Sequence, residues 1–247
     1  MKQTSKIAVV ILAAGQGKRM NSSLPKVMHI LKDKPIIGHI VSAFEKLESV
    51  GKIIVVVPST HTLIQDYLGN RVEYCIQTEQ KGTGHATLCT EPLVQEKNVL
   101  VLYGDLPCVT TDAFTRLADE HITHNNIVTM MTTPVENYDE WRAPFLTYGR
   151  IVRNDQGNIQ EIVEYKDANE QQKNILEVNS GVYCFRSEWL FDQLKHVVPN
   201  NAQAEYYLTD VVKMALEKGG SVGSVVLSAR EAIGVTTQED LRMLESL

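Results

Sequence analysis

The strongest constraint on the fold is an apolar run that leads directly into a glycine-rich, basic loop. Residues 7–14 are unbroken in apolar character and rich in β-branched side chains, which predicts a strand buried on both faces in a parallel sheet. Gly15 and Gly17 follow and permit backbone angles that turn main-chain N–H groups toward a ligand. Arg19 and Lys26 add two cations suited to a triphosphate. The junction therefore predicts a phosphate site in an α/β protein.

The glycine loop matches neither of two common phosphate-binding fingerprints. The dinucleotide-binding loop needs a third glycine where Met20 stands. The ATPase loop ends in Gly-Lys-Ser/Thr, whereas Arg19 follows Gly17-Lys18 here. A different nucleotide loop and an ordinary strand-to-helix turn are both open interpretations of this segment alone.

Composition narrows the class of partner. The chain has 247 residues, enough for one large α/β domain or two small ones, and a formal charge of −6 without any block of Lys or Arg. We therefore expect neither nucleic acid nor an anionic membrane as a partner. No apolar run approaches the roughly 20 residues of a membrane span.

Cysteine usage and the N-terminal residues bear on the location of the protein. The four cysteines stand singly, without the spacing of zinc ligands, which predicts reduced thiols in a cytoplasmic protein. The first residues, with the apolar run behind them, could also imitate a short secretory signal. Cleavage there would remove the first strand and separate it from the glycine loop.

Apolar periodicity divides the chain into two halves of different character. The first half alternates strands and helices, as a parallel sheet requires: strands at 7–14, 53–57, 99–102 and 127–132, helices at 35–47, 83–95 and 112–121. The second half adds a hairpin of 150–153 and 159–164, strands at 178–185 and 221–227, and helices at 189–196, 208–218 and 237–247. No linker separates the halves, so we expect one domain over residues 1–247 with a Rossmann-like, doubly wound, mixed and mainly parallel sheet.

A carboxylate follows the third predicted strand. Asp105 comes three residues after 99–102, where ligands bind in open α/β sheets. Opposite a glycine loop with two cations, it is suited to a Mg²⁺ ion that bridges nucleotide phosphates. The alternative is a carboxylate that caps the turn before Pro107.

A second glycine cluster opens the helix predicted at 83–95. Gln77 carries an amide that can donate and accept at the edge of a base, and Gly82 lets the backbone approach a planar ring. His85 is interpreted as a packed or hydrogen-bonded histidine rather than a catalyst. His121 and His124 are interpreted as part of a solvated helix face rather than as metal ligands.

The second half offers polar side chains at predicted strand ends. Glu164 and Asn179 are suited to sugar hydroxyls, because each side chain can bridge two neighbouring OH groups. By spacing alone, these residues could equally belong to ordinary polar loops.

Together these segments resemble the uridylyltransferase domain of the bacterial bifunctional N-acetylglucosamine-1-phosphate uridylyltransferases/glucosamine-1-phosphate acetyltransferases, within the sugar-1-phosphate nucleotidyltransferase family. The motifs that carry the resemblance follow the family's order from about Ile7 to Leu247. They are Leu12-Ala13-Ala14-Gly15-x-Gly17-x-Arg19-Met20, Leu24-Pro25-Lys26-Val27, Glu79-Gln80-x-Gly82-Thr83-Gly84-His85-Ala86, Tyr103-Gly104-Asp105, Tyr148-Gly149-Arg150-Ile151, Val163-Glu164-Tyr165-Lys166-Asp167-Ala168, Asn179-x-Gly181 and Asn201-Ala202-Gln203-x-Glu205-Tyr206-Tyr207.

The resemblance implies transfer of a uridylyl group from UTP to a sugar 1-phosphate, with Mg²⁺ as cofactor and a place in cell-wall precursor biosynthesis. The chemistry needs positioning and charge stabilisation rather than a general base. The roles implied are catalysis by Arg19, Lys26 and Asp105, nucleotide binding by Leu12, Ala14, Gly15, Gly17, Gln77, Gly82 and Thr83, sugar binding by Gly104, Thr147, Glu164 and Asn179, and metal binding by Asp105 and Thr236. About 1–135 would then handle the nucleotide and about 136–247 the sugar.

Three positions depart from the family's pattern. Lys18 stands where a threonine is usual, and Thr236 stands where the second metal ligand is an asparagine. Thr147 brings a side chain to a sugar wall that is usually glycine, so N-acetylmuramic acid or glucose 1-phosphate is an alternative substrate. A nucleotide-sugar binding protein without turnover is the alternative outside the enzymes.

The resemblance also bears on assembly. The hexapeptide repeats of the bifunctional enzymes do not occur in the sequence, so we expect neither acetyltransferase activity nor the trimer that such repeats build. A monomer or small homo-oligomer is expected instead.

Overall fold

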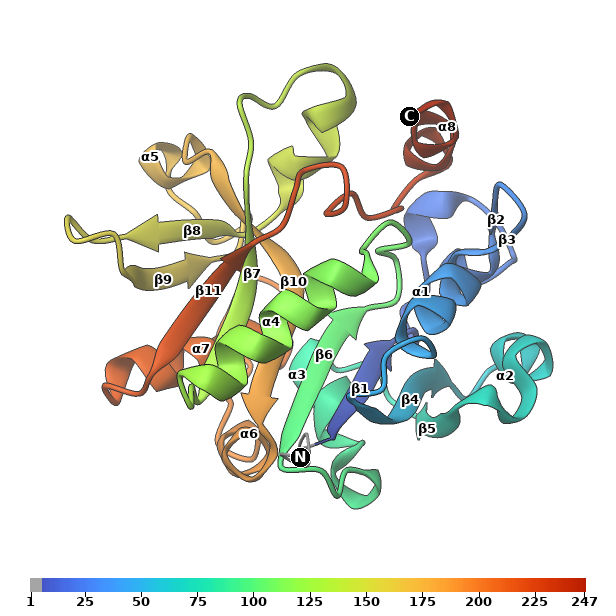
Figure 1. Ribbon diagram of the computed structural model, residues 1–247. Helices are drawn as coiled ribbons and strands as arrows, with labels where there is room; N and C mark the ends of the chain where they lie inside the picture. The colour runs from blue at the N-terminus through green and yellow to red at the C-terminus, as the bar shows by residue number, and fades with distance from the viewer. Residues whose placement is uncertain (1–5) are drawn as a thin grey trace.

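The computed structural model describes residues 6–247, and of Lys18 it describes only the backbone. A nine-stranded sheet runs through the molecule, with β11-β7-β10-β6-β1-β4-β5 as its main order (Figure 1). Its strands are β1 (Ile7–Leu12), β4 (Val50–Pro58), β5 (Glu73–Gln77), β6 (Asn98–Tyr103), β7 (Val128–Pro134), β10 (Glu177–Arg186) and β11 (Val222–Val226), with the hairpin β8 (Arg150–Arg153) and β9 (Ile159–Val163) beside β10.

The sheet is mixed and mainly parallel, as predicted. β1 pairs in parallel with β4 and β6, and β4 pairs in parallel with β5. At the other edge β11 pairs in parallel with β7. Only β10 reverses direction within the main order, because it runs antiparallel to both β6 and β7. Its first residues consequently lie at the edge where the parallel strands end.

Helices cover both faces of the sheet (Figure 1). One face packs on α1 (Ile36–Phe44), α2 (Leu63–Leu68) and α4 (Thr111–Thr123), and the other on α3 (Thr83–Leu88), α6 (Ser187–Leu194) and α7 (Leu208–Glu217). The last helix, α8 (Gln238–Ser246), lies beside β2 and adds Leu244 to the first core (Figure 1). Val9 and Ile11 enter the first core, and Ala8 and Val10 enter the second. Because β1 is buried on both faces, its residues form an unbroken apolar run that begins at Ile7.

The predicted hairpin is confirmed. β8 and β9 pair antiparallel through a turn in which Gly157 has a φ of +81°. The hairpin joins β10 through one residue pair, Val178 with Arg150. A short helix, α5 (Glu170–Lys173), then leads toward β10, and Asn169 caps its start.

Several boundaries differ from the sequence-based expectations. The first strand ends at Leu12 rather than Ala14, because the chain begins to turn there into the glycine loop. The helix expected over 83–95 ends at Leu88 and gives way to a single 3-10 turn at Glu91–Leu93, where Pro92 interrupts helical hydrogen bonding. β5, α2, α5 and a two-stranded ribbon of β2 (Ile30–Leu31) and β3 (Lys34–Pro35) were not predicted.

The interpretation of His121 as a solvated residue is wrong. The His121 side chain is 1% exposed and hydrogen bonds to Thr129 Oγ1 at 3.0 Å and Asn98 Oδ1 at 3.3 Å. Burial lowers its pKa to about 4, so the ring is neutral at ordinary pH. His124 is exposed, as expected.

Two expectations concern the N-terminus and membranes. Residues 1–5 lie outside the described residues, while the apolar run behind them forms a central strand of the sheet. Among residues 6–247, no helix combines the length and the apolar character needed to cross a membrane.

Candidate active site

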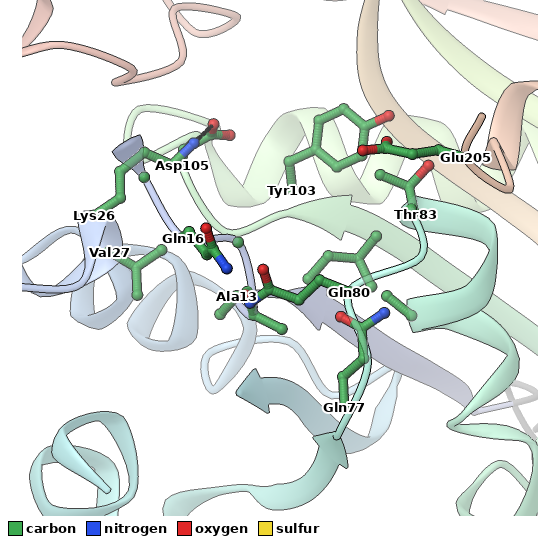
Figure 2. A pocket seen from close by; sticks show the side chains of 16 residues that line it. Ala13, Gln16, Lys26, Val27, Gln77, Gln80, Thr83, Tyr103, Asp105 and Glu205 are labelled. Atoms are coloured by element: carbon green, nitrogen blue, oxygen red, sulfur yellow. Dashed lines mark hydrogen bonds and ion pairs between the residues drawn. The ribbon is translucent and has the colours of Figure 1, made fainter. Parts of the chain in front are cut away.

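A large cavity of about 750 Å³ opens at the carboxyl ends of β1, β5 and β6 (Figure 2). The residues predicted to bind nucleotide all line it: Leu12, Ala14, Gly15, Gly17, Gln77, Gly82 and Thr83. Lys26 and Asp105 line it as well. The glycine loop and the second glycine cluster therefore face a common space, although they are far apart in the sequence.

The first glycine loop is shaped by close backbone packing at Gly17. Its φ is +59°, and a Cβ there would lie 2.8 Å from the Cβ of Lys26. The Met20 N–H donates to the Gly17 carbonyl at 2.8 Å and closes the turn. Gly15 has no atom near its missing Cβ and is exposed, so its backbone is accessible from the cavity. This loop can present N–H groups to an anion.

The opposite end of the cavity is built by Gln77 and Gly82. Gln77 ends β5, is 4% exposed, and its Nε2 donates to Nδ1 of His85 at 3.0 Å. Gly82 has a φ of +107°, and a Cβ there would lie 2.6 Å from the Tyr206 carbonyl oxygen. Glycine is thus required sterically at position 82, and His85 is hydrogen-bonded, as interpreted from the sequence.

Four polar residues line this cavity that were not among the predicted site residues: Gln16, Gln80, Tyr103 and Glu205. The Gln80 amide donates to the Ala14 carbonyl and ties the two glycine segments together. Gln80, Tyr103 and Glu205 stand inside motifs quoted above, whereas Gln16 occupies a variable position of its motif. Only the motif positions carried a signal that could have identified them.

Lys26 and Asp105 form an ion pair at the centre of the site. The Lys26 ammonium donates to Asp105 Oδ2, and both side chains are largely buried. Asp105 also lines a second, smaller cavity. Its backbone carbonyl accepts a hydrogen bond from the Val235 N–H at 2.9 Å, which holds the segment before α8 against β6.

The smaller cavity, of about 150 Å³, adjoins the first at Tyr103 and Asp105. It brings together Arg19, Thr147, Glu164, Asn179 and Thr236, all predicted site residues. Gly104 lines neither cavity. It is buried behind the wall, where a Cβ would lie 3.0 Å from the Leu12 carbonyl oxygen.

The carboxylate of Glu164 is shaped by its surroundings. It accepts a hydrogen bond from Thr209 Oγ1 at 3.2 Å. Burial, together with the neighbouring carboxylates of Asp167 and Asp210, raises the pKa of Glu164 above its usual value. The Glu164 carboxyl group lines the smaller cavity and can accept hydrogen bonds from a neutral ligand such as a sugar hydroxyl.

Asn179 lies at the start of β10, where the pairing with β7 shifts register. Its Oδ1 accepts from the Gly181 N–H at 3.1 Å, and its amide contacts the Tyr183 hydroxyl. Gly181 has a φ of +72°, and a Cβ there would lie 2.5 Å from the Tyr103 ring. A glycine is therefore needed where β10 passes the wall between the cavities.

Thr147 reaches the smaller cavity in a defined orientation. Its hydroxyl donates to the Pro144 carbonyl at 3.1 Å within the 3-10 segment Glu140–Thr147. The hydroxyl is thus engaged with the protein's own backbone.

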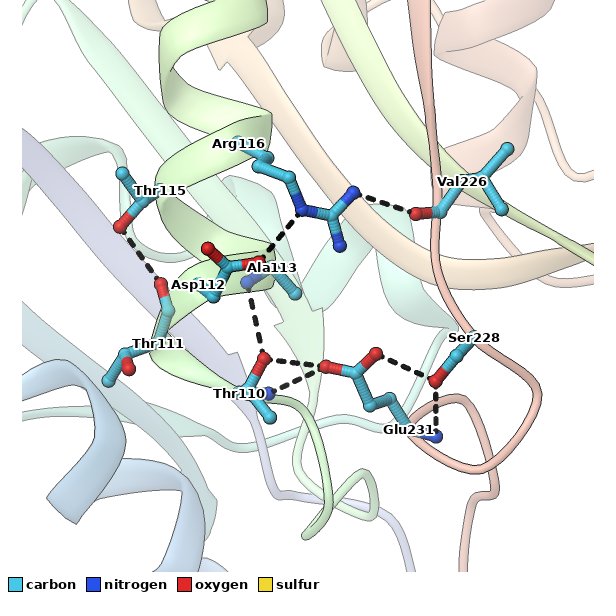
Figure 3. A network of polar contacts seen from close by, with 9 residues as sticks. All are labelled: Thr110, Thr111, Asp112, Ala113, Thr115, Arg116, Val226, Ser228 and Glu231. Atoms are coloured by element: carbon cyan, nitrogen blue, oxygen red, sulfur yellow. Dashed lines mark hydrogen bonds and ion pairs between the residues drawn. The ribbon is translucent and has the colours of Figure 1, made fainter.

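The segment that carries Thr236 is anchored at several points. Tyr148 Oη accepts from the Gly234 N–H at 2.8 Å, and Asp240 Oδ2 accepts from the Thr236 N–H at 2.8 Å. Earlier in the segment, the Glu231 carboxylate accepts hydrogen bonds from Thr110, which caps the start of α4, and from Ser228 of the same segment (Figure 3). Thr236 is consequently held at the cavity that Asp105 also lines.

The donor set fits a divalent cation that shares its ligands with a substrate. Among residues 6–247, no group of three or more His, Cys, Asp and Glu side chains forms a self-contained metal cage. Asp105 offers a carboxylate and Thr236 a hydroxyl at the same cavity. Mg²⁺ is commonly held by one or two carboxylates together with substrate phosphates, and a sparse set of this kind is compatible with that mode of binding.

Comparison with known proteins identifies close relatives. The chain is 39% identical over 241 residues to the bifunctional protein GlmU of Streptococcus suis (strain 98HAH33), which covers 96% of this chain and 51% of that protein. It is 42% identical over 242 residues to the bifunctional protein GlmU of Geobacillus sp. (strain WCH70), with coverage of 96% and 51%. The chain therefore spans about half the length of the curated relatives it matches.

Solved structures and family models agree with this likeness. A UDP-glucose pyrophosphorylase complexed with UDP-glucose has a TM-score of 0.74 at 17% identity, over 98% of this chain and 97% of that one, which supports the fold. The model of the nucleotidyl transferase family matches residues 8–236. This chain, with its two glycine segments around one cavity, belongs to the nucleotidyl transferase family.

Proposed function

We propose that the chain forms a UDP-sugar and pyrophosphate from UTP and a sugar 1-phosphate, with N-acetylglucosamine 1-phosphate as the favoured sugar. The observation that carries this proposal is the Lys26–Asp105 pair at the junction of two adjoining cavities. The larger cavity fits a nucleoside triphosphate, and the smaller one fits a sugar ring. A reaction that joins the two ligands requires such a junction.

In the proposed reaction, a phosphate oxygen of the sugar 1-phosphate attacks the α-phosphorus of UTP. A new P–O bond forms as the bond between the α-phosphorus and the bridging oxygen of pyrophosphate breaks, and the electron pair leaves with pyrophosphate. Arg19 lines the smaller cavity rather than the larger one, so it would reach the departing phosphates where the two cavities meet, and Lys26 would neutralise charge on the α-phosphate or the incoming phosphate. Positioning and charge stabilisation supply the rate enhancement, and no general base is needed.

Binding of each substrate is assigned to one cavity. Gln77 and Gly82 would contact the uracil, while Leu12, Ala14, Gly15, Gly17 and Thr83 line the path to the phosphates. Glu164 and Asn179 would accept and donate hydrogen bonds to sugar hydroxyls. Mg²⁺ would be held by Asp105 and Thr236 and would supply charge neutralisation at the phosphates.

The proposal extends to organisation and location. Residues 1–247 are proposed to form a single nucleotidyltransferase domain, as a monomer or small homo-oligomer. A cytoplasmic location is supported by the four cysteines, all free in the structure.

The test is pyrophosphate release with UTP, Mg²⁺ and a panel of sugar 1-phosphates. We expect release with N-acetylglucosamine 1-phosphate and weaker release with glucose 1-phosphate and N-acetylmuramic acid 1-phosphate. Fastest turnover with another sugar 1-phosphate would mean that this sugar, and not N-acetylglucosamine, is the preferred substrate. UDP-sugar binding without any pyrophosphate release would contradict the enzyme and favour a binding protein.

A further inference from the structure

The amide of Gln77 is held from behind by one histidine. Its Nε2 lies 3.0 Å from Nδ1 of His85, and because an amide nitrogen can only donate, Nδ1 is the acceptor in this orientation of the amide. Figure 2 shows the Gln77 nitrogen turned toward α3 and the amide oxygen turned away from it. Gln77 is 4% exposed and lines the larger cavity, so its oxygen is the acceptor left for a ligand.

His85 is itself fixed in place. It stands near the start of α3, where the Gly84 N–H donates to the Tyr206 carbonyl at 2.7 Å. The Tyr206 ring lies beside the imidazole, with 6.4 Å between ring centroids. His85 also lines a separate cavity of about 200 Å³ with Lys81 and Leu194, where solvent can accept a hydrogen bond from Nε2–H. With the ring proton on Nε2, Nδ1 is the acceptor that faces Gln77.

We infer that His85 is a positioning residue that selects uridine over cytidine nucleotides by fixing which end of the Gln77 amide faces the base. The inference rests on the proposed function, in which Gln77 contacts the base. Uracil carries an N–H donor at N3, whereas cytosine carries an acceptor at the same position. A fixed amide oxygen accepts from the first and repels the second.

The selectivity depends on the cost of turning the amide over. Rotation of the Gln77 amide by half a turn would present its NH₂ group to a cytosine. It would also break the existing hydrogen bond, which could form again only if the imidazole proton moved from Nε2 to Nδ1 so that the ring donated to the amide oxygen. Without the acceptor at residue 85, both orientations become accessible and the discrimination is lost.

The experiment compares three variants in kcat/KM for UTP and for CTP, measured as pyrophosphate release with the same sugar 1-phosphate. His85→Leu removes the acceptor at similar size and is expected to lower the UTP:CTP ratio about tenfold or more, mainly through KM. His85→Asn restores an oxygen near the Nδ1 position and is expected to recover most of the ratio. Leu88→Ala, on the same helix and around the same rear cavity, should leave it unchanged.

The outcomes separate this inference from the proposed function. An unchanged ratio in folded His85→Leu would overturn the role of His85, as would an equal loss in Leu88→Ala. If the unmodified protein releases no pyrophosphate, the proposed function fails, and the same ratio is then measured from the Kd values of UTP and CTP by calorimetry. A protein that binds both nucleotides equally well in that assay overturns the inference too.

Discussion

Asp105 takes part in two kinds of contact at once. Its backbone carbonyl fixes the segment before α8, and its carboxylate pairs with Lys26 across the site. A metal ion at this carboxylate must therefore share it with the ammonium group or displace that group. The pair also keeps both charges from being buried alone, which would be strongly unfavourable.

Replacement of Asp105 by asparagine should separate its role in turnover from its role in folding. Asp105→Asn keeps the shape and the backbone contact but removes the charge, and we expect kcat to fall about a hundredfold or more, as for loss of other charge-stabilising groups. Circular dichroism should still show the native fold, although the thermal midpoint should fall because the Lys26 ammonium loses its partner. The matched control is Asp112→Asn, an exposed carboxylate on α4 that pairs with Arg116. Near-full turnover in Asp105→Asn would remove Asp105 from the reaction.

At the scale of the element, the segment between β11 and α8 has no regular structure, yet its conformation is specified by side chains. Figure 3 shows Glu231 bridging the start of α4 and Ser228. Thr110 Oγ1 donates to Glu231 Oε1 at 2.6 Å and Ser228 Oγ donates to Oε2 at 2.7 Å. These contacts tie the segment to a helix before it reaches the active site.

Glu231 should make stability depend on pH. Burial raises its pKa, but the hydrogen bonds from Thr110 and Ser228 outweigh burial and leave the pKa below its ordinary value. The contribution of Glu231 to the free energy of unfolding is therefore complete above the pKa that this side chain has in the unfolded chain. It is lost as the pH falls through the lower pKa of the folded protein. Glu231→Gln should reduce the free energy of unfolding by about 1–2 kcal/mol at neutral pH.

Urea unfolding at about pH 7 and about pH 4 tests this dependence. The deficit of Glu231→Gln should shrink at the lower pH, where the native side chain begins to lose its charge. Glu48→Gln, an exposed position in the turn after α1, serves as the control and should show no deficit. A deficit of the same size at both values would mean that charge plays no part.

The elements that the sequence predicted well are those buried on both faces. β1, β4 and β6 have continuous apolar runs, and the equally buried β7 places Val128, Met130 and Met131 among threonines, because each strand contacts helices on either side. β5 was missed because it is an edge strand in which Ile76 is 57% exposed, so its pattern is weak. The end of α3 at Leu88 could have been predicted from Pro92, because a proline four residues on cannot donate a helical hydrogen bond to the Leu88 carbonyl.

The candidate site shows the same division. Glycines 15, 17 and 82 and the charged residues near them could be predicted, because motif spacing records local backbone shape. The burial of Gly104 depends on tertiary packing against the Leu12 carbonyl, which leaves no pattern in the sequence. The Thr147 hydroxyl bonds locally to the Pro144 carbonyl, but that bond depends on the 3-10 geometry of Glu140–Thr147, which was not predicted.

At the scale of the whole molecule, one buried arginine holds the backbone that forms a wall of the smaller cavity at Thr147 and Tyr148. Arg150 is fully buried, and its guanidinium donates to the carbonyls of Phe145, Leu146, Tyr148 and Lys173. It also lies over the ring of Tyr138, 4.7 Å from the centroid. Burial lowers the pKa of Arg150 from its ordinary value. This planar fork of donors fixes the backbone on both sides of Thr147.

Arg150→Lys should therefore affect one substrate and spare the other. A lysine keeps the charge but cannot satisfy four dispersed carbonyls. We expect KM for the sugar 1-phosphate to rise about tenfold, and KM for UTP to change less than about twofold, because the larger cavity lies outside this network. Steady-state kinetics with each substrate varied in turn measures both values.

Arg153→Lys provides the control within the same hairpin. Arg153 pairs with Glu177 and lines neither cavity. Its replacement should leave both KM values unchanged. Equal increases for UTP and the sugar phosphate in Arg150→Lys would mean that the two cavities are not separable.

The hairpin of β8 and β9 shares a single ladder pair with the main sheet, although Arg153 pairs with Glu177 and three hairpin isoleucines, Ile151, Ile159 and Ile162, join the core. A hairpin with so little ladder pairing can change in length at its turn without disturbing the parallel strands that carry the glycine loop. Related chains could then differ in the sugar that they bind while their nucleotide binding stays the same. We expect inherited differences in sugar choice to be concentrated between β7 and β10.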